Sequence, residues 1–448
     1  MSLAVLLSPK VRQQFRDARE RRGAAATAPT DWAARHLDGV RRSWADAVSD
    51  IPYYSWLVAS GAAPSEIRTW DDLRSIPPLT RQIIQRQPAD FVRRSGPPAS
   101  MITTAGSTGT PLRMGSNRAE RELMRIVKLA EWQALGYQPG SRLFLIWGHA
   151  HLLGTGWAGR LNQVKRRMAD AWLGYRRVDA YLLTPELCRA HAEALVGFRP
   201  VGVIGYSSAL DLFARYTSAF RPRFRALGVR FVLATAEAPP RADTLERIED
   251  LFDCPVVQEY GGAEFGQVAF KNGRSPFRVY SDLNYVECAQ PEADAPGAHP
   301  ALLTSLYPRY LPLVRYRVGD TLVGPERQGH GHVVQFNEVG GRVNDVILLG
   351  GGAAIHSVAI FHCIHQEESV YNIQMVLRDE GVEIRLVSSA DDRGAMEARI
   401  RGRLAQVHSS LADARFTYVE DLLTSRAGKR RWFVDQRTSP PCVATPAT

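Results

Sequence analysis

A segment rich in glycine, serine and threonine, residues 103–111, has the composition of a loop that binds phosphate groups. Gly106 and Gly109 allow the backbone to turn tightly and to approach a phosphate closely. Ser107 and Thr108 supply hydroxyl groups that can donate hydrogen bonds to phosphate oxygens, beside the N–H groups of the loop itself. The segment is not a Walker A loop, because no Lys-Ser or Lys-Thr pair follows the second glycine. A polar surface loop is the alternative interpretation.

Two carboxylates lie in segments suited to a nucleotide. Glu264 follows Tyr260 and a pair of glycines, which open space for a flat ligand. Carboxylate oxygens are ligands that Mg²⁺ prefers, so Glu264 could hold the metal ion of a triphosphate. Asp320 ends the segment 315–320 and could accept hydrogen bonds from both hydroxyls of a ribose. The alternatives are a solvated glutamate in a turn and an aspartate that caps a strand.

Two basic residues in the last third of the chain lie in segments that suit a nucleotide. Arg342, in the segment 341–347, suits a phosphate or a ribose, and the glycines at 350–352 suit a hinge. Lys429 is the only lysine after Lys271 in a chain that otherwise uses arginine, which indicates a need for a compact ammonium group. A charged hairpin and a basic surface loop are the respective alternatives.

A rival hypothesis rests on residues 154–159, which fit the dinucleotide-binding pattern G-x-G-x-x-G. This segment lies between a predicted strand and a predicted helix, and Asp179 follows about 20 residues on. That arrangement would indicate an NAD-dependent dehydrogenase. Residues 148–153, however, separate the strand from the glycines and are too many for the tight first turn of that motif.

Apolar runs and helical periodicity alternate in the middle of the chain, which predicts an α/β fold. Short apolar runs are typical of strands that helices cover on both faces. Residues 1–95 are predicted to be mostly helical, and residues after 343 are predicted to form a small α+β domain. The predicted helices span residues 13–22, 31–48, 118–135, 159–172 and 396–408, and the predicted strands span residues 142–147, 201–204, 230–233, 277–280, 285–288, 301–306, 372–377 and 382–387.

The composition is that of an ordinary globular protein: 448 residues, 45% of them hydrophobic and 23% charged, enough for two or three domains. The formal charge of +10 comes mainly from arginines spread along the chain, without a nucleic-acid-binding motif. The five cysteines form no C-x-x-C pair, so neither a disulfide framework nor a zinc site is predicted. No signal peptide or spanning segment is evident, and we expect a cytoplasmic protein that binds neither nucleic acid nor membrane.

The motifs together, in this order and spacing, resemble the adenylate-forming superfamily of acyl-CoA synthetases, peptide-synthetase adenylation domains and luciferases. Residues 51–54 and 73–80 are similar to the phenylacetate–coenzyme A ligase branch, and the resemblance covers essentially the whole chain. It implies a large multi-layer N-terminal adenylation domain, residues 1–342, and a small mobile C-terminal domain, residues 343–448. The activity it implies is ATP-dependent formation of an acyl-AMP with release of pyrophosphate, followed by acyl transfer to coenzyme A.

The resemblance also assigns roles to individual residues. Lys429, Glu264 and Arg342 would be catalytic, with Glu264 holding Mg²⁺, and Asn344 would be the hinge. The ATP-binding residues would be Thr104, Gly106, Ser107, Thr108, Gly109 and Thr110 in the phosphate loop, Glu237 and Ala238 at the adenine, Tyr260 and Gly261 beside it, and Asp320 at the ribose.

The acid and the acceptor are less well defined than the nucleotide. An aromatic acid is expected from the branch, and its pocket would be lined by Trp147, His149, His151, Tyr206, Ser207, Thr235, Gly262 and Ala263. Coenzyme A is the expected acceptor, and an amine or hydroxyl acceptor of secondary metabolism is the alternative. A non-catalytic nucleotide sensor would lack Lys429 or Glu264, and both are present. The oligomeric state stays open, with a homodimer as one option.

Four positions depart from the superfamily pattern. Thr110 stands where many members have lysine, and Ala263 replaces a threonine or serine whose hydroxyl contacts the AMP phosphate. Asn344 replaces an acidic residue or lysine at the hinge, and His356 stands where proline is common. The changes near the hinge keep the alternative acceptors open.

Overall fold

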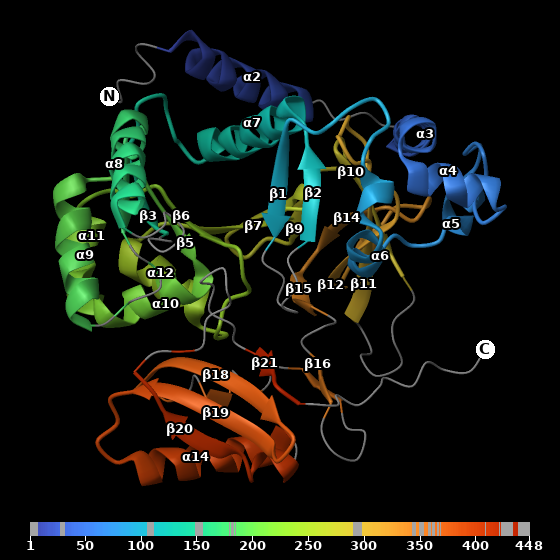
Figure 1. The fold of residues 1–448 in the computed structure, drawn as a ribbon. Coiled ribbons are helices and arrows are strands. Elements are labelled where there is room, and N and C mark those ends of the chain that lie inside the picture. The colour runs from blue at the N-terminus through green and yellow to red at the C-terminus, as the bar shows by residue number, and fades with distance from the viewer. Residues whose placement is uncertain are drawn as a thin grey trace. The chain divides into compact units, whose positions relative to one another are not determined.

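The computed structural model describes residues 8–26, 32–104, 112–147, 156–178, 180, 183, 185–289, 298–342, 346–348, 354–356, 360, 363–364, 367, 369–407, 409–420, 422 and 433–437 (Figure 1). The described N-terminal part of the chain is mostly helical. Pro52 begins one helix, where its missing N–H leaves no bond unmade. Thr69 and Thr80 cap two others by accepting from the N–H groups of Asp72 and Ile83. The elements are α2 (Pro9–Ala26), α3 (Trp32–Asp50), α4 (Pro52–Ala59), α5 (Trp70–Ser75), α6 (Arg81–Arg86) and η1 (Pro88–Phe91).

A nine-stranded sheet in the order β13-β14-β9-β8-β7-β6-β5-β3-β4 forms the centre of the larger part of the chain. The strands from β7 to β4 in this order run parallel, and β7, β8, β9, β14 and β13 pair antiparallel. The strands are β3 (Leu143–Ile146), β4 (Tyr175–Val178), β5 (Gly202–Tyr206), β6 (Phe231–Thr235), β7 (Val256–Gly262), β8 (Gly266–Asn272), β9 (Phe277–Val279), β13 (Glu326–Arg327) and β14 (Val333–Phe336).

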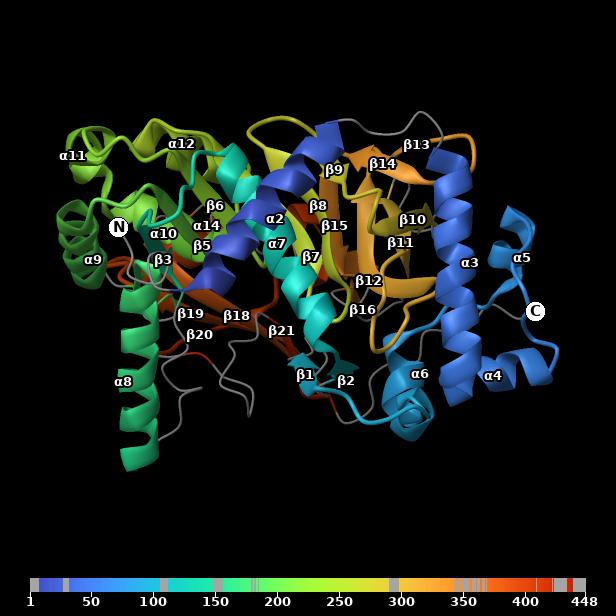
Figure 2. The same cartoon turned by 90° about the horizontal axis from the view of Figure 1, so that it is seen from above.

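Helices cover both faces of the parallel strands, which explains their continuous apolar sequences. Leu143 and Leu145 of β3 pack toward α2 and α7, whereas Phe144 and Ile146 pack toward α9, α10 and α12 (Figure 2). The predicted α/β class is therefore confirmed. The covering helices are α7 (Arg118–Ala134), α8 (Gly156–Leu173), α9 (Pro185–Phe198), α10 (Ser207–Tyr216), η3 (Ser218–Phe220), α11 (Arg221–Arg225) and α12 (Thr244–Phe252).

A second sheet, of order β10-β11-β12-β15, packs against the N-terminal helices and the end of the large sheet in one apolar core. A separate hairpin, β1-β2, leads into α7. Residues 79 and 316 form an isolated parallel bridge that ties the start of α6 to the second sheet. The strands are β1 (Ser100–Thr104), β2 (Leu112–Ser116), β10 (Asn284–Cys288), β11 (Ala298–Ser305), β12 (Tyr316–Val323) and β15 (Glu338–Arg342).

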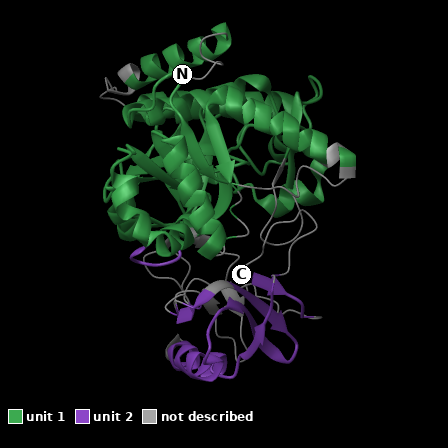
Figure 3. Cartoon of the chain, turned by 90° about the vertical axis from the view of Figure 1, so that its left-hand side faces the viewer, with its two compact units in different colours: residues 1–106, 111–239, 245–340 green, residues 107–110, 240–244, 341–448 purple. Residues whose placement is uncertain are grey.

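The chain divides into two compact units (Figure 3). Unit 1 comprises Met1–Gly106, Pro111–Pro239 and Leu245–Gly340, and unit 2 comprises Ser107–Thr110, Pro240–Thr244 and Gly341–Thr448. Unit 2 contains a four-stranded sheet, of order β20-β19-β18-β21, that packs on one helix around its own core. Its elements are β16 (Val346–Leu348), β17 (Ala354–His356), β18 (Val370–Arg378), β19 (Gly381–Ser388), α14 (Arg393–Val407), η6 (Ser409–Leu411), β20 (Arg415–Tyr418) and β21 (Phe433–Asp435).

Four cysteines fall within the described ranges, Cys188, Cys254, Cys288 and Cys363, and all four are free. Cys442 lies outside those ranges. No helix among the described residues has the length and apolarity that crossing a bilayer requires.

Three histidines join α3 to the β13–β14 turn in a buried polar cluster. His36 donates from Nε2 to the carbonyl oxygen of Ser281 (2.7 Å), and its Nδ1 lies 2.9 Å from Nε2 of His330. His332 accepts from the N–H of Val286 at Nδ1 (3.1 Å) and contacts the Ser281 hydroxyl through Nε2 (2.9 Å). His332 therefore uses one ring nitrogen as an acceptor, which requires its neutral form, and His36 is buried beside it.

Burial lowers the pKa of His36 from 6.5 to about 4 and that of His332 from 6.5 to about 2. The unfolded chain binds protons near pH 6.5, whereas the folded chain does not bind them at these sites until the pH is lower. We therefore expect the free energy of unfolding to fall as the pH decreases from about 6.5 toward about 4, by about 1.4 kcal/mol per pH unit for each histidine.

Urea unfolding at a series of pH values in this window measures the effect. A His36→Gln/His332→Gln variant keeps polar groups at both positions and should lose stability less steeply on acidification. An equally steep decline in the variant would contradict the assignment.

Candidate active site

The residues predicted to line the acid pocket gather at one edge of the large sheet. Trp147 directly follows β3, Tyr206 ends β5, and Thr235 ends β6. These strands run parallel, and their register pairs Ile146 with Gly205 and Tyr206 with Thr235. Carboxyl ends of parallel strands share an edge, so the three residues lie along the same edge of the sheet.

This edge contains the point where the strand order reverses. The chain passes from β3 to β4 on one side of β3 and then returns to β5 on the other side. In open α/β sheets, ligands bind in the crevice outside the carboxyl ends of the strands at such a switch point. Trp147 and Tyr206 stack across it, with ring centroids 4.2 Å apart and an interplanar angle of 19°. The paired rings make a flat apolar surface suited to an aromatic or planar group.

The segment predicted to line the adenine continues along the same edge. Ser207, the first residue of α10, is buried, and its hydroxyl donates to the carbonyl oxygen of Glu237 (2.9 Å). Ala236 has a φ of 72°, a left-handed conformation that residues with a Cβ rarely adopt. Such strain persists only where surrounding contacts fix the backbone. Ala238 is exposed two residues further on, so the segment offers backbone and a small side chain to a ligand.

The two glycines of β7 serve the packing of the chain itself. A Cβ on Gly261 would lie 2.5 Å from the carbonyl oxygen of Gly266 in β8, and one on Gly262 would lie 2.6 Å from the ring of Phe265. Both distances are too short for real contacts, so these glycines allow the close approach of β7 and β8. The sequence predicted that these glycines open space for a flat ligand. Instead, atoms of Phe265 and Gly266 fill the space beside them. Ala263 follows them at the start of the turn.

Tyr260 and Asp320, far apart in sequence, meet in the structure. The tyrosine hydroxyl donates to Oδ2 of Asp320 (3.0 Å), which joins β7 of the large sheet to β12 of the second sheet. Both side chains are buried, and the Tyr260 ring packs edge-on against Phe336. The predicted base-stacking residue and the predicted ribose-binding residue are thus brought together, with the ring set into the core.

Glu264 is buried, and its Oε1 accepts from Nη1 of Arg81 at 2.7 Å. The predicted Mg²⁺ ligand is therefore neutralised by a guanidinium group, which leaves it unsuited to a cation in this arrangement. No set of three or more His, Cys, Asp and Glu side chains within the described residues is arranged to hold a metal ion. Arg81 occupies the Glu264 carboxylate in this arrangement, and the role of Glu264 as an Mg²⁺ ligand stays a prediction.

Two arginines of this region were not predicted from the sequence. Arg81 directly follows the segment 73–80, and the bridge between Leu79 and Tyr316 holds this part of the chain near Glu264. Arg309 is buried, donates to the backbone carbonyl of Glu264 and donates to the hydroxyl of Tyr307 (2.8 Å). The contacts of Arg81 and Arg309 with Glu264 join positions that are 183 and 45 residues apart, so no local pattern could have indicated them.

Several predicted residues lie outside the described part of the chain. Thr104 and Arg342 end β1 and β15, and only their backbone is described. His356 ends β17 in the same way. The residues outside the described ranges are Gly106, Ser107, Thr108, Gly109, Thr110, His149, His151, Asn344 and Lys429.

The dinucleotide hypothesis loses its geometric basis. That fingerprint requires a tight turn from strand to helix, but β3 ends at Ile146 and α8 begins only at Gly156. Gly159 then lies inside α8. Gly154 and Asp179 are outside the described residues.

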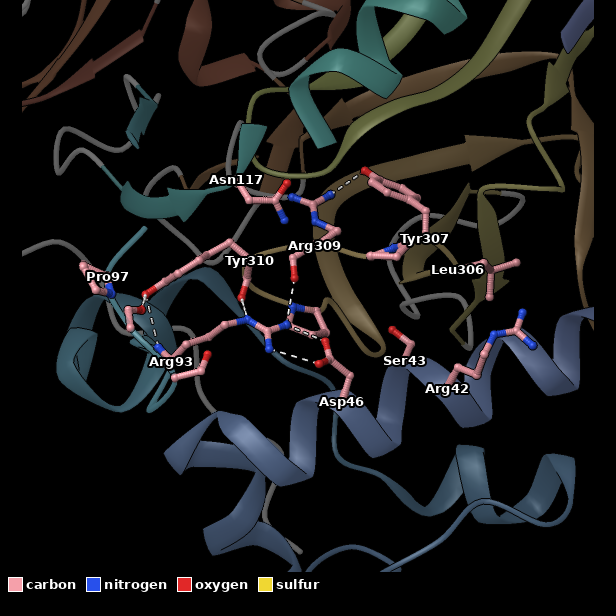
Figure 4. Close-up of a pocket in the computed structure, with 14 residues that line it drawn as sticks. Arg42, Ser43, Asp46, Arg93, Pro97, Asn117, Leu306, Tyr307, Arg309 and Tyr310 are labelled. Atoms are coloured by element: carbon pink, nitrogen blue, oxygen red, sulfur yellow. Dashed lines mark hydrogen bonds and ion pairs between the residues drawn. The ribbon is translucent and has the colours of Figure 1, made fainter. Parts of the chain in front are cut away.

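A cavity of about 530 Å³ lies between α3, residues 93–97 and residues 306–312 (Figure 4). Its lining contains none of the residues predicted for the active site. Arg93 in its wall is paired with Asp46 and Asp50 and also donates to the backbone carbonyl of Arg309 (2.8 Å). These groups hold the N-terminal helices to the second sheet.

No family model matches the sequence, and no curated protein matches it. Solved structures share its fold. One is 2-hydroxyisobutyryl-CoA ligase in the postadenylation state in complex with R3-HIB-AMP, with a TM-score of 0.63, 17% identity and 90% of each chain covered. The same ligase in complex with 2-HIB-AMP and CoA in the thioesterification state gives a TM-score of 0.55, 17% identity and 91% of each chain covered. The chain is therefore structurally similar to adenylate-forming acyl-CoA ligases over about nine-tenths of its length.

Proposed function

We propose that this protein activates a carboxylic acid with ATP, forming an acyl-AMP and pyrophosphate, and then transfers the acyl group to coenzyme A. The observation that carries the proposal is the sheet edge. Trp147, Tyr206, Thr235 and Tyr260 lie there on or directly after four adjacent strands, β3, β5, β6 and β7. The proposal is also supported by the shared fold. Nine-tenths of the chain align with a CoA ligase whose crystal structure contains R3-HIB-AMP.

Each region of the chain would contribute separately to the reaction. The Trp147–Tyr206 stack would position the acid, and Asp320, fixed by the Tyr260 hydroxyl, would receive the ribose. Residues 104–110 would donate to the phosphates, and Lys429 would neutralise charge as the carboxylate attacks the α-phosphate. Holding both anions in place removes an entropic cost of up to about 7–11 kcal/mol in favourable cases.

The second half-reaction would follow a movement of the C-terminal domain. We place the boundary between residues 342 and 343, with Asn344 as the hinge and Arg342 beside it. Rotation there would withdraw Lys429 and admit the acceptor. The flat Trp147–Tyr206 surface favours an aromatic acid, as in the phenylacetate–coenzyme A ligase branch. We also propose that the enzyme is cytoplasmic and uses soluble substrates.

Acid-dependent release of pyrophosphate from ATP tests the proposal, measured over a panel of aromatic and aliphatic acids with and without coenzyme A. We expect release with a subset of aromatic acids and a thioester product, identified by mass, when coenzyme A is present. Release without a thioester would support adenylation and move the transfer step to an amine or hydroxyl acceptor. No release with any acid would overturn the proposal.

A further inference from the structure

Helix α8 carries a row of large apolar side chains that the described residues of unit 1 leave exposed. The row consists of Trp157, Leu161, Val164, Met168 and Trp172, with side chains exposed by 79, 40, 52, 68 and 40%. Their spacing of four, three, four and four residues places them on one face of the helix. Soluble monomers rarely leave such a contiguous apolar face in water.

The row points away from the rest of unit 1. Asp170, on the opposite side of α8 at 3.6 residues per turn, is bound by Arg177 of β4 through two hydrogen bonds of 3.1 Å. Gln163 and Arg166 lie on that same inner side and are partly buried. Figures 1 and 2 show α8 at the periphery of unit 1, with no described helix or strand on its outer side. The described residues of unit 1 therefore leave the apolar row open along its length.

The charges that border the row are all positive. Trp157, Leu161, Val164 and Met168 follow the d-a-d-a spacing of a coiled-coil seam. Arg160 and Arg167 then occupy the flanking g positions, and Lys165 occupies an e position. All three are exposed, and the one acidic residue of α8 is the inward-facing Asp170.

We propose that this face of α8 docks an amphipathic helix of a partner protein whose apolar seam is flanked by glutamate or aspartate. Charges at e and g positions determine which helices pair, and three cations here select carboxylates on the partner. A second copy of α8 would oppose arginine and lysine with arginine and lysine, so self-pairing is disfavoured. The inference is independent of the proposed function.

The width of the row favours a helix over a membrane surface. Its five side chains span a sector of about 80° at 100° per residue, which matches a coiled-coil seam rather than a broad interfacial face. The row extends over about 22 Å, or about four helical turns. An interface of that length is small, which indicates a transient complex.

Binding of two designed helical peptides tests the proposal on the full chain. Both carry leucine at the seam; one has glutamate and the other lysine at every e and g position. We expect the glutamate peptide to bind at least about tenfold more tightly than the lysine peptide in titrations followed by fluorescence anisotropy at low salt. A charge-reversed variant, Arg160→Glu/Lys165→Glu/Arg167→Glu, should invert that preference.

A second variant separates the seam from general electrostatics. Leu161→Gln/Val164→Gln/Met168→Gln changes exposed side chains only, so its thermal unfolding should match that of the unmodified chain, and it should lose binding of the glutamate peptide. Equal affinity for both peptides, or binding that survives in this variant, would overturn the proposal. Two further outcomes would also overturn the proposal. If the unmodified chain dimerises in a concentration-dependent way and this variant does not, the face binds a second copy. If the unmodified chain binds vesicles of anionic phospholipid and this variant does not, the face binds a membrane.

Discussion

Replacing Lys429 with alanine is expected to abolish acid-dependent release of pyrophosphate while leaving the binding of ATP mostly intact. The carboxylate and the α-phosphate repel each other as they approach, and one ammonium group between them lowers the energy of the transition state more than that of bound ATP. Loss of such a group typically lowers the rate by about 100-fold to 1,000-fold. Pyrophosphate release, measured beside equilibrium binding of a fluorescent ATP analogue, separates the two effects.

The neighbouring Arg430→Ala change is the matched control, because it removes a cation from the same segment and should leave the rate near that of the unmodified protein. Lys429→Arg keeps the charge but changes its shape, and we expect it to recover little activity. Full release of pyrophosphate by Lys429→Ala would remove this lysine from the mechanism. Equal losses in Lys429→Ala and Arg430→Ala would indicate a general requirement for positive charge in the segment.

Much of the layered part of the fold could be predicted because its local signals agree with its tertiary environment. The apolar run 142–147 became β3, covered on both faces, and the periodic stretch 118–135 became α7 (Arg118–Ala134). The start of α7 is fixed by a capping box in which Asn117 accepts from the N–H of Glu120. This motif depends only on residues close together in the sequence. The order of the strands has no such local signal. The β3 strand pairs with both β4 and β5, and only the packed structure shows that the connection reverses there.

The candidate site also contains some features that local sequence predicts and others that depend on contacts between distant residues. Tyr206 and Thr235 were expected in one pocket from the family resemblance. The structure places them side by side because each ends a parallel strand, and such ends share an edge. The partners of the acidic residues could not be predicted. The Tyr260–Asp320 and Arg81–Glu264 pairs join positions that are 60 and 183 residues apart. Such contacts depend on how distant parts of the chain pack together. The sequence around Glu264 therefore does not predict Arg81 as its partner.

Removal of the Arg81 side chain as Arg81→Met is expected to lower the free energy of unfolding by about 3 kcal/mol, because it leaves a buried carboxylate without its counter-charge. Glu264 is only 6% exposed, so water cannot replace the guanidinium group. The matched control is Arg274→Met, which breaks an ion pair of similar length, 2.8 Å, with Glu246. Both of those side chains are largely exposed, and such pairs contribute less than about 1 kcal/mol.

The double variant Arg81→Met/Glu264→Gln identifies the source of the loss. If the penalty is the uncompensated charge, neutralising Glu264 should restore most of the stability, and the two single changes will be strongly non-additive. Urea unfolding of the four proteins in the cycle, at a pH where carboxylates are ionised, measures that coupling. The contrary result is that Arg81→Met lowers the free energy of unfolding no more than Arg274→Met does. That result would mean that the buried Glu264 carboxylate does not need the Arg81 counter-charge, and Glu264 would again be a candidate ligand for Mg²⁺.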